Sequence, residues 1–428
     1  MPLTLEDFHL NAQREKHLII RGARCAIGPH ETTHASVQIA GDRITRILRV
    51  PSRFSDAVSG SANLDLSGFL LLPGLVNAHD HLEYALFPRL GNPPYRNYIE
   101  WGEDIHERFP DVIAKHRAVP KEVRLWWGGI RNLLCGVTTV SHHNPFWPEL
   151  QREEFPVRVV RDYGWGHSLA LGGDLCQARA AAPEGRPFIV HACEGIDEQA
   201  REELRGLDRL GLLDSMAVLV HGLAIDDEGV ALMCDRRASL ILCPSSNKFL
   251  FEKLPDLSLL SRIEKVALGS DSPLTAVGDL LDEVRFARRF CGISTSAAYC
   301  MVTTVPAAIL RLGDAQGSVM ESGISDLIAV RDTGEDAAER LETLSMNEVE
   351  FVMIGGRVQM ASESILERLP SQAKQGLEPL FIDGSIRWLR APVKALVRKA
   401  EEVLGKGEVS LGSRRVRIPE NAEVEHAC

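Results

Sequence analysis

The middle of the chain, residues 70–310, alternates short apolar runs with helix-forming stretches, and this alternation limits the folds open to it. The apolar runs are rich in Val, Ile or Leu and have the length of buried parallel strands. Strands that alternate with helices are typical of a (β/α)8 TIM-like barrel, whose chemistry lies on loops at the C-terminal ends of the strands. The pattern predicts strands at residues 70–79, 137–142, 156–162, 187–193, 216–221, 238–243 and 265–270.

An eighth strand has room only in residues 164–172, so we expect the barrel to be distorted there. The clearest helical stretches are residues 121–135, 197–211, 226–235 and 297–311.

The flanks of the barrel region carry a different pattern. Residues 17–50 alternate apolar and polar residues between Gly-containing turns, which indicates antiparallel strands. The same alternation of apolar and polar residues occurs in residues 323–334 and 349–362. We therefore expect a small β-sandwich domain built from both ends of the chain.

These patterns predict a division of the chain into four segments. Residues 17–69 and 312–362 form the two parts of the β domain, and residues 70–311 form the barrel between them. Residues 363–428 are expected to be an appendage with a helix at 391–404 and no catalytic role.

Charge and cysteine usage exclude several classes of protein. The net charge of −11 argues against binding of nucleic acid or an anionic membrane. No apolar stretch is long enough to span a bilayer, and the polar residues 1–17 lack a hydrophobic signal core. The nine cysteines are scattered without a CxxC pair, so neither a zinc ribbon nor a disulfide framework is indicated. We expect a cytoplasmic protein with a small-molecule substrate, for which a homodimer is compatible.

Two histidines, His79 and His81, follow the first apolar run in the segment LPGLVNAHDH. Residues i and i+2 of a strand point to the same side, so these imidazoles face one way. Neutral imidazole is a common protein ligand for zinc and iron. A pair of solvated loop histidines would give the same pattern, so the choice between a metal site and loop histidines depends on the other strand ends.

Three further strands also end in polar groups: RPFIVH in His191, MAVLVH in His221 and KVALGSD in Asp271. The carboxyl ends of barrel strands share one rim, so these groups should converge. Divalent metals need three or four N or O ligands from rigid elements and one open position for water. His79, His81, His191 and Asp271 supply such a set.

The HxH pair after the PGLVNAH strand, the later HxxE, the further strand-end histidine and the GSD ahead of a proline resemble the amidohydrolase superfamily. The similarity is greatest to the branch of cytosine deaminases, guanine deaminases and triazine chlorohydrolases, and it extends over about residues 17–362. The resemblance implies that Glu194 is the proton shuttle and that His221 orients or polarises the attacking water or the departing group. The resemblance also implies that the metal ligands are His79, His81, His191 and Asp271.

The chemistry of these residues agrees with such roles. Glu194 lies three residues after His191, about one helical turn, so its carboxyl can face the same cavity and pass protons to a leaving amine. The alternative for Glu194 is a charge that faces the dipole at a helix N-terminus. Asp271 can both ligate a metal and accept a proton from the water that the metal activates.

One metal ion is expected. Some superfamily members bridge two metals with a carboxylated lysine on the fourth strand, but no lysine occurs between Lys121 and Lys248. We therefore predict one divalent ion, with zinc favoured over iron. The nucleobase deaminases with an HxE and PCxxC zinc site are excluded, because CPSS at residues 243–246 lacks the second cysteine.

Candidate substrate contacts come from the same rim and from aromatic residues. The second strand ends in TTVSHHNP, which places His142 and His143 at the rim. Aromatic rings can stack on a planar substrate, and ordinary packing is the alternative for each of them. The candidates for pocket walls are Tyr84, Trp101, Trp165 and His167.

Three functions are compatible with these features. The first is hydrolytic deamination of an amino-substituted N-heterocycle, and the second is hydrolysis of a cyclic amide, an N-acyl bond or a chlorinated ring at the same site. The third is a catalytically silent scaffold, which the complete ligand set disfavours. Glu194 favours deamination, because an amine leaving group needs a proton, although an amide nitrogen needs one too.

Overall fold

The computed structural model describes residues 17–49, 61–171 and 173–419. Most of the polar N-terminal segment, residues 50–60 of the first β segment and the end of the expected appendage lie outside the described residues. No helix in the described ranges is both long and apolar enough to cross a membrane.

Eight short strand segments form the barrel in the described part of the chain, and all hydrogen-bonded neighbours among them are parallel. The first three form one sheet and the other five a second sheet. Between the last and first segments, the Asp271 N–H donates to the His79 carbonyl at 3.2 Å. The predicted barrel is thus confirmed. Its segments are β7 (Leu75–Asp80), β8 (Val137–His142), β9 (Arg158–Val159), β10 (Gly164–Gly166), β11 (Phe188–Ala192), β12 (Ala217–His221), β13 (Ser239–Leu242) and β14 (Val266–Leu268).

The barrel is distorted between β9 and β10. Only residues 160–163 join these segments, all of them described, and they contain no helix. Adjacent parallel strands need a crossover of about a dozen residues, so this connection is too short for a full βα unit. The strands predicted at 156–162 and 164–172 therefore shrink to segments of two and three residues.

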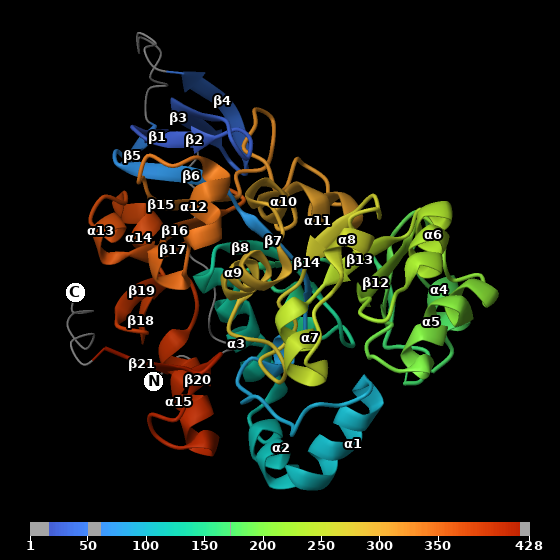
Figure 1. The fold of residues 1–428 in the computed structure, drawn as a ribbon. Coiled ribbons are helices and arrows are strands. Elements are labelled where there is room, and N and C mark those ends of the chain that lie inside the picture. Colours follow the sequence, from blue (N-terminus) through green and yellow to red (C-terminus); the bar gives the residue numbers. More distant parts are fainter. Residues whose placement is uncertain (1–16, 50–60, 172, 420–428) are drawn as a thin grey trace.

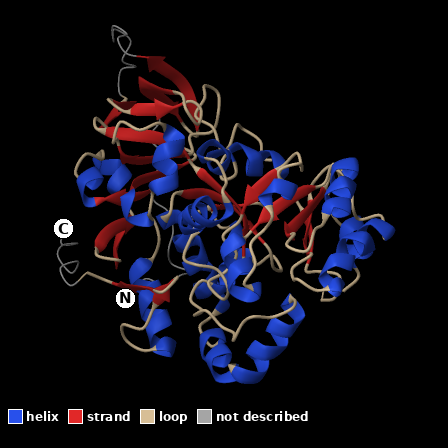
Figure 2. Cartoon of the chain, viewed as in Figure 1, coloured by secondary structure: helices blue, strands red, loops and turns tan. Residues whose placement is uncertain are grey.

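Helices flank the barrel strands (Figure 2), and three of them match the predicted stretches. These are α3 (Lys121–Leu134), α5 (Glu198–Arg209) and α6 (Asp227–Arg236). The helix predicted at 297–311 is instead two short helices, α10 (Thr295–Cys300) and α11 (Thr304–Ile309). Pro306 explains the break, because proline lacks an N–H and is tolerated only in the first turn of a helix.

The remaining helices lie in loops and flanks. Those of the barrel region are η1 (Leu82–Tyr84), α1 (Tyr98–Arg108), α2 (Pro110–Arg117), η2 (Pro148–Gln151), α4 (Leu175–Ala180), α7 (Pro244–Phe251), α8 (Leu257–Leu260) and α9 (Leu280–Cys291). The others are α12 (Ala337–Thr343), η3 (Met346–Glu348), α13 (Glu363–Leu366), α14 (Ser371–Lys374) and α15 (Val393–Leu404).

Strands from both ends of the chain form a sandwich beside the barrel (Figure 1). β3 pairs with β1 in one layer and with β2 in the other, and apolar side chains of both layers share one core. The first layer contains β1 (His17–Arg21), β3 (Thr32–Ala40), β4 (Arg43–Arg49) and β5 (Ala62–Asp65). The second contains β2 (Arg24–Ala26), β6 (Phe69–Pro73), β15 (Leu327–Arg331), β16 (Val349–Ile354) and β17 (Arg357–Ser362).

The strand predicted at residues 70–79 is divided at Gly74. β6 before it pairs with β15 in the sandwich, and β7 after it belongs to the barrel. A Cβ at position 74 would lie 2.3 Å from the Thr138 side chain, so the chain changes sheets where only glycine fits. The boundary between sandwich and barrel therefore runs through one apolar run of the sequence.

Residues 363–419 extend the sandwich sheet instead of standing apart as an appendage. β19 (Ser385–Leu389) pairs with β17, and β18 (Glu378–Ile382) pairs with β19. The sheet ends with β21 (Arg414–Arg417) and β20 (Ser410–Leu411). The predicted helix at 391–404 is confirmed as α15.

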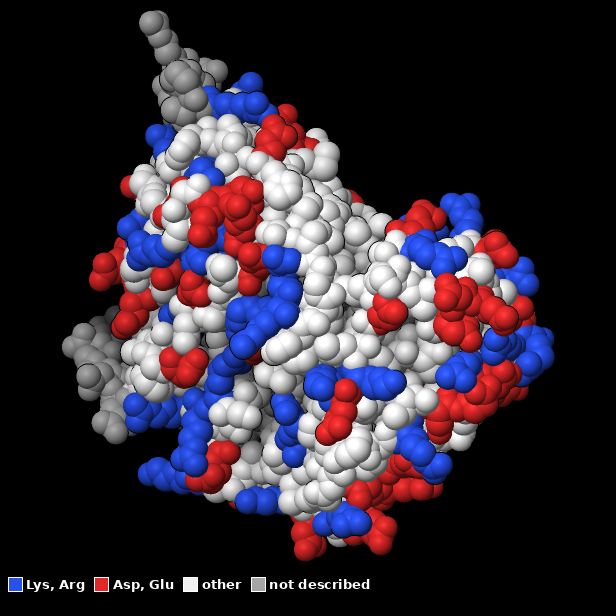
Figure 3. All heavy atoms as spheres, in the orientation of Figure 1, with Lys and Arg blue, Asp and Glu red and all other residues white. Residues whose placement is uncertain are grey.

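Charged side chains of both signs are interspersed on the face in Figure 3, with uncharged surface between them. Lys and Arg side chains form a run from the centre of this face toward its lower left.

Asp80, between the two histidines of β7, points to the opposite side of the strand and contacts α3. Its carboxylate lies 2.8 Å from the Arg131 guanidinium and accepts from the Asn132 amide at 2.7 Å. Arg131 also donates to the carbonyl of Asp271 at 2.7 Å. Because Asp80 and Arg131 are almost fully buried, this ion pair connects β7, α3 and the end of β14 away from water.

Replacing Asp80 with Ala should therefore cost about 3–5 kcal/mol of stability, because it leaves a buried guanidinium uncompensated. Denaturant unfolding monitored by circular dichroism measures the loss. Asp208→Ala is the matched control, since Asp208 pairs with Arg236 at 2.7 Å on the surface, where solvent screens the interaction. Equal losses in the two variants would contradict the importance of burial.

Candidate active site

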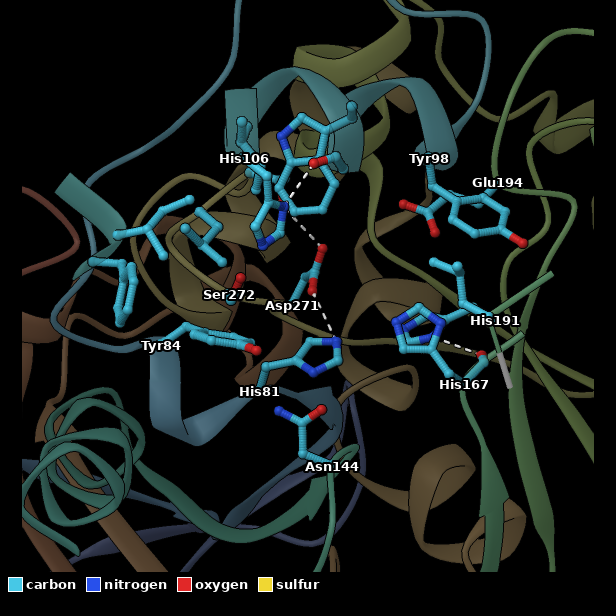
Figure 4. A pocket seen from close by; sticks show the side chains of 18 of the residues that line it. His81, Tyr84, Tyr98, His106, Asn144, His167, His191, Glu194, Asp271 and Ser272 are labelled. Carbon is cyan, nitrogen blue, oxygen red and sulfur yellow. Dashed lines mark hydrogen bonds and ion pairs between the residues drawn. The ribbon is translucent and has the colours of Figure 1, made fainter. Parts of the chain in front are cut away.

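Four metal-ligand candidates converge at the C-terminal rim of the barrel. His79 and His81 come from the end of β7, His191 from β11 and Asp271 from the segment after β14. The Asp271 Oδ1 lies 3.8 Å from His79 Nε2 and 3.6 Å from His81 Nε2, and the Nε2 atoms of His79 and His191 are 3.3 Å apart. All four side chains are buried, and His81, His191 and Asp271 turn toward one cavity (Figure 4).

These distances fit a divalent ion. Two ligands at about 2.1 Å from one zinc ion, at a tetrahedral angle, are about 3.4 Å apart. His191 Nδ1 lies 2.9 Å from the His167 carbonyl, which can only accept, so the lone pair of His191 is on Nε2 and faces the site. Burial and the neighbouring imidazoles lower the pKa of His79 and His191 well below the usual value. Both rings are therefore neutral, as metal binding requires.

Two hydroxyl groups hold the Asp271 carboxylate. The Thr275 hydroxyl donates to Oδ2 at 3.0 Å, and the Ser246 hydroxyl lies 2.9 Å from that of Thr275. Burial alone would raise the pKa of Asp271, but His221, His81 and these hydroxyls outweigh it and lower the pKa. Asp271 is thus held ionised, as a ligand should be. The sequence did not predict a role for Thr275 or Ser246, although Ser246 lies soon after the end of β13.

Glu194 and His221 form a second pair at the cavity. Glu194 Oε1 lies 3.6 Å from His221 Nε2, and His221 Nδ1 lies 3.1 Å from the Asn247 amide oxygen. The amide oxygen accepts, so His221 carries its proton on Nδ1 and presents a lone pair to Glu194. Burial, with the charges of Asp271 and Glu203, raises the pKa of Glu194 well above the usual value. The raised pKa favours the protonated form, which can donate.

Glu194 does not serve as the N-terminal charge of a helix. The next helix, α5, begins at Glu198, and the Asp197 side chain caps it by accepting from the Ala200 N–H at 2.9 Å. Glu194 lies outside the first turn, so the helix-dipole alternative is not supported. His221 and Asp271 also have positive φ angles of 76° and 49°, a costly conformation for non-glycine residues that clusters at functional sites.

A cavity of about 240 Å³ is lined by His81, His191, Glu194, His221 and Asp271. Its walls are mostly apolar and come in part from the α1–α2 hairpin. Trp101 is held by an indole N–H that donates to the Leu90 carbonyl at 2.9 Å. The predicted wall residues Tyr84, Trp101 and His167 line the cavity, together with Phe87, Tyr98 and Leu274.

Three predicted substrate contacts do not reach the cavity wall. The Trp165 ring lies in the middle of β10, in the barrel interior below the rim. His142 accepts from the Leu82 N–H at 3.3 Å behind the site, and His143 is held by the Gly166 carbonyl at 3.0 Å. None of the three residues lines the cavity, so the prediction that they contact substrate is not supported.

The sequence did not indicate that two other residues, Tyr98 and Asn144, line the cavity. Tyr98, on α1, has its hydroxyl 2.8 Å from the Glu203 carboxylate and 3.0 Å from the Ser168 hydroxyl. Asn144 lines the same cavity near His81 (Figure 4). Only the packing of loops against the rim brings these residues to the site.

Known proteins are similar to this chain in sequence and in fold. Residues 174–359 match the model of the amidohydrolase family. A 5-methylthioadenosine/S-adenosylhomocysteine deaminase of Natronomonas pharaonis is 26% identical over 365 residues, which cover 71% of this chain and 81% of the relative. The chain contains an amidohydrolase-family domain.

Other known proteins are similar over most of the chain. An imidazolonepropionase of Porphyromonas gingivalis is 26% identical over 385 residues, which cover 76% of this chain and 89% of the relative. The crystal structure of atrazine chlorohydrolase TrzN from Arthrobacter aurescens, complexed with zinc, has a TM-score of 0.65 at 18% identity and covers 80% of this chain and 95% of that chain. The resemblance seen in the motifs is confirmed, and the protein is a metal-dependent hydrolase.

Proposed function

We propose that this amidohydrolase deaminates an amino-substituted N-heterocycle by hydrolysis and releases ammonia. The observation that carries the proposal is Glu194, a buried carboxyl with a raised pKa that lies 3.6 Å from His221 and beside the metal-ligand set. A departing amine needs a proton, and a neutral carboxylic acid held away from water can supply it. The deaminase relative described above supports the same chemistry.

The site residues have separate roles in this proposal. His79, His81, His191 and Asp271 hold one divalent ion, which when bound would lower the pKa of water toward neutrality. Zinc is favoured over iron, because the atrazine chlorohydrolase structure contains zinc. A second ion bridged by a carboxylated lysine is not expected, since no lysine lies between Lys121 and Lys248.

The remaining groups bind the substrate and move protons. Asp271 accepts the proton of the attacking water, and Glu194 donates to the departing nitrogen. His221, held by Asn247, faces the Glu194 carboxyl and orients it. Tyr84 and Trp101 offer aromatic surface for a planar ring, and the apolar walls exclude bulk water.

The alternative is hydrolysis of a cyclic amide, an N-acyl bond or a chlorinated ring at the same site. A carboxylic acid also protonates the leaving nitrogen of an amide, so Glu194 is compatible with the amide reactions. A chloride leaving group needs no proton, so Glu194 would have no role as an acid toward that leaving group. The complete set of ligands does not support a silent scaffold.

A screen for ammonia release tests the proposal. Protein loaded with zinc is incubated with aminated purines, adenosine derivatives, pyrimidines, pterins and triazines, and ammonia is measured in a coupled assay. The Asp271→Ala variant, purified in parallel, controls for contaminating deaminases. Ammonia release by the wild type alone supports the proposal, whereas ring opening without ammonia, or chloride release from chlorinated triazines alone, supports the alternative.

The assembly and the domain division are also proposals. We infer that the first division lies at Gly74, a few residues after the predicted 69/70, and the second at 311/312, and that the sandwich has a core of its own. A homodimer is compatible with the small-molecule function. Sedimentation equilibrium measures the assembly state, and limited proteolysis locates the boundaries.

A further inference from the structure

His143, the residue after β8, lies beside the metal-ligand candidates and not in the cavity wall. Its imidazole is fully buried, with the ring centroid 4.2 Å from that of His191 and 5.1 Å from that of His79. Ligand atoms of His79, His143 and His191 lie within 4.8 Å of one another, as do those of His79, His81 and Asp271. His143 is therefore as close to the site as the ligands that the motifs indicate.

The hydrogen bonds of His143 leave one ring nitrogen free. Nε2 lies 3.0 Å from the Gly166 carbonyl, which can only accept, so Nε2 carries the proton. In the neutral ring, Nδ1 then has a lone pair, and it is buried without a hydrogen-bond partner among the described residues. Leaving such an acceptor unpaired costs about 1–3 kcal/mol, which an apolar side chain would avoid.

The neighbouring His142 shows the contrast. It is equally buried, but its Nδ1 accepts from the Leu82 N–H at 3.3 Å. Of these two adjacent histidines, only His143 has an Nδ1 lone pair that accepts no hydrogen bond from the described residues. The Gly166 carbonyl in β10 holds its ring on the side of His79 and His191.

We propose that His143 Nδ1 is an additional ligand of the same ion, next to the nitrogen atoms of His79 and His191. The inference depends on the proposed metal site and raises the number of protein donors from four to five.

Three variants test this role. His143→Gln keeps an amide N–H near the position of Nε2 for the Gly166 carbonyl and removes Nδ1. His143→Asn keeps an oxygen near the position of Nδ1 as a replacement ligand. His142→Asn is the matched control, because its amide oxygen can still accept from the Leu82 N–H. Melting curves show whether each variant is folded.

The readouts are zinc affinity, from competition with a chromogenic chelator, and the visible spectrum of the cobalt(II)-substituted protein. Loss of a residue that only hydrogen-bonds to a metal ligand typically lowers metal affinity 10–100-fold. Loss of a direct ligand should cost more, so His143→Gln should lower zinc affinity about 100-fold or more. Its cobalt(II) absorption should become stronger as the coordination number falls. His143→Asn should recover part of the affinity, and His142→Asn should match the wild type.

Opposite results overturn the inference. Wild-type affinity and an unchanged cobalt(II) spectrum in His143→Gln would make His143 a packing residue and leave the proposed function intact. Two ions in the wild type, with one lost in His143→Gln, would place His143 at a separate second site. A wild type that binds no divalent ion would overturn the proposed function together with this inference.

Discussion

Glu194→Gln should lower turnover by about a hundredfold or more while the fold, the ion and substrate binding are retained. Glutamine has nearly the shape of the protonated carboxyl and can still donate a hydrogen bond, but it cannot accept and release a proton. Three features of the structure attribute this loss of turnover to proton transfer by Glu194. Glu194 is buried next to His221, its pKa is raised well above the usual value, and it lies outside the first turn of α5.

Glu283→Gln is the matched control for this experiment. Burial raises the pKa of Glu283 to about 8, but its carboxylate accepts from the Ser245 N–H at 2.8 Å and does not line the cavity. Turnover should therefore change little in this variant. The measurement is the initial rate of ammonia release with a substrate from the screen, with a melting curve and metal content for each protein. Near-wild-type turnover in metal-loaded Glu194→Gln would overturn the shuttle and weaken the case for deamination.

His79→Ala and Asp271→Ala should each lose the ion, so that the metal content falls from about one equivalent per chain to nearly none. His79 Nε2 is 3.3 Å from His191 Nε2, and Asp271 Oδ1 is within 3.8 Å of both β7 histidines. Each substitution thus removes a donor from the centre of the set. Turnover should fall to the background rate, because the water is no longer activated.

Elemental analysis of protein prepared without chelators measures this effect. His106→Ala serves as the control, since His106 lies in the cavity wall on α1 with its ring nitrogen 2.7 Å from the Gly102 carbonyl. It should keep the ion. Two equivalents in the wild type would contradict the single-ion prediction, and an unchanged metal content in both ligand variants would contradict the assignment of the ligands.

The sequence by itself determined the barrel and the polar ends of its strands. Apolar runs of strand length, separated by helical stretches, require parallel strands buried on both faces. Once that architecture is given, His191, His221 and Asp271 have to meet at one rim, because all parallel strands end on the same side. The two-residue period of a strand likewise places His79 and His81 together and sends Asp80 to the other side. These inferences need only local periodicity and the direction of the strands.

The tertiary structure decided how the segments pair and where each side chain lies. In the run from Phe69 to Asp80, Pro73 and Gly74 mark a break locally. Only the pairing of β6 with β15 and of β7 with β8 shows that the chain changes sheets there. The pairing of β17 with β19 likewise depends on strands that compete for a sheet edge, and the periodicity of either strand does not reveal its partner.

The same holds for side chains around the site. His142 and His143 are adjacent in the sequence, yet one accepts from the Leu82 N–H and the other has a free Nδ1 near His191. Thr275 and Asn247 support Asp271 and His221 through hydrogen bonds whose distances depend on the packing of loops. Local patterns determine which residues reach the rim, whereas the directions of side chains at the rim depend on contacts between segments far apart in the chain.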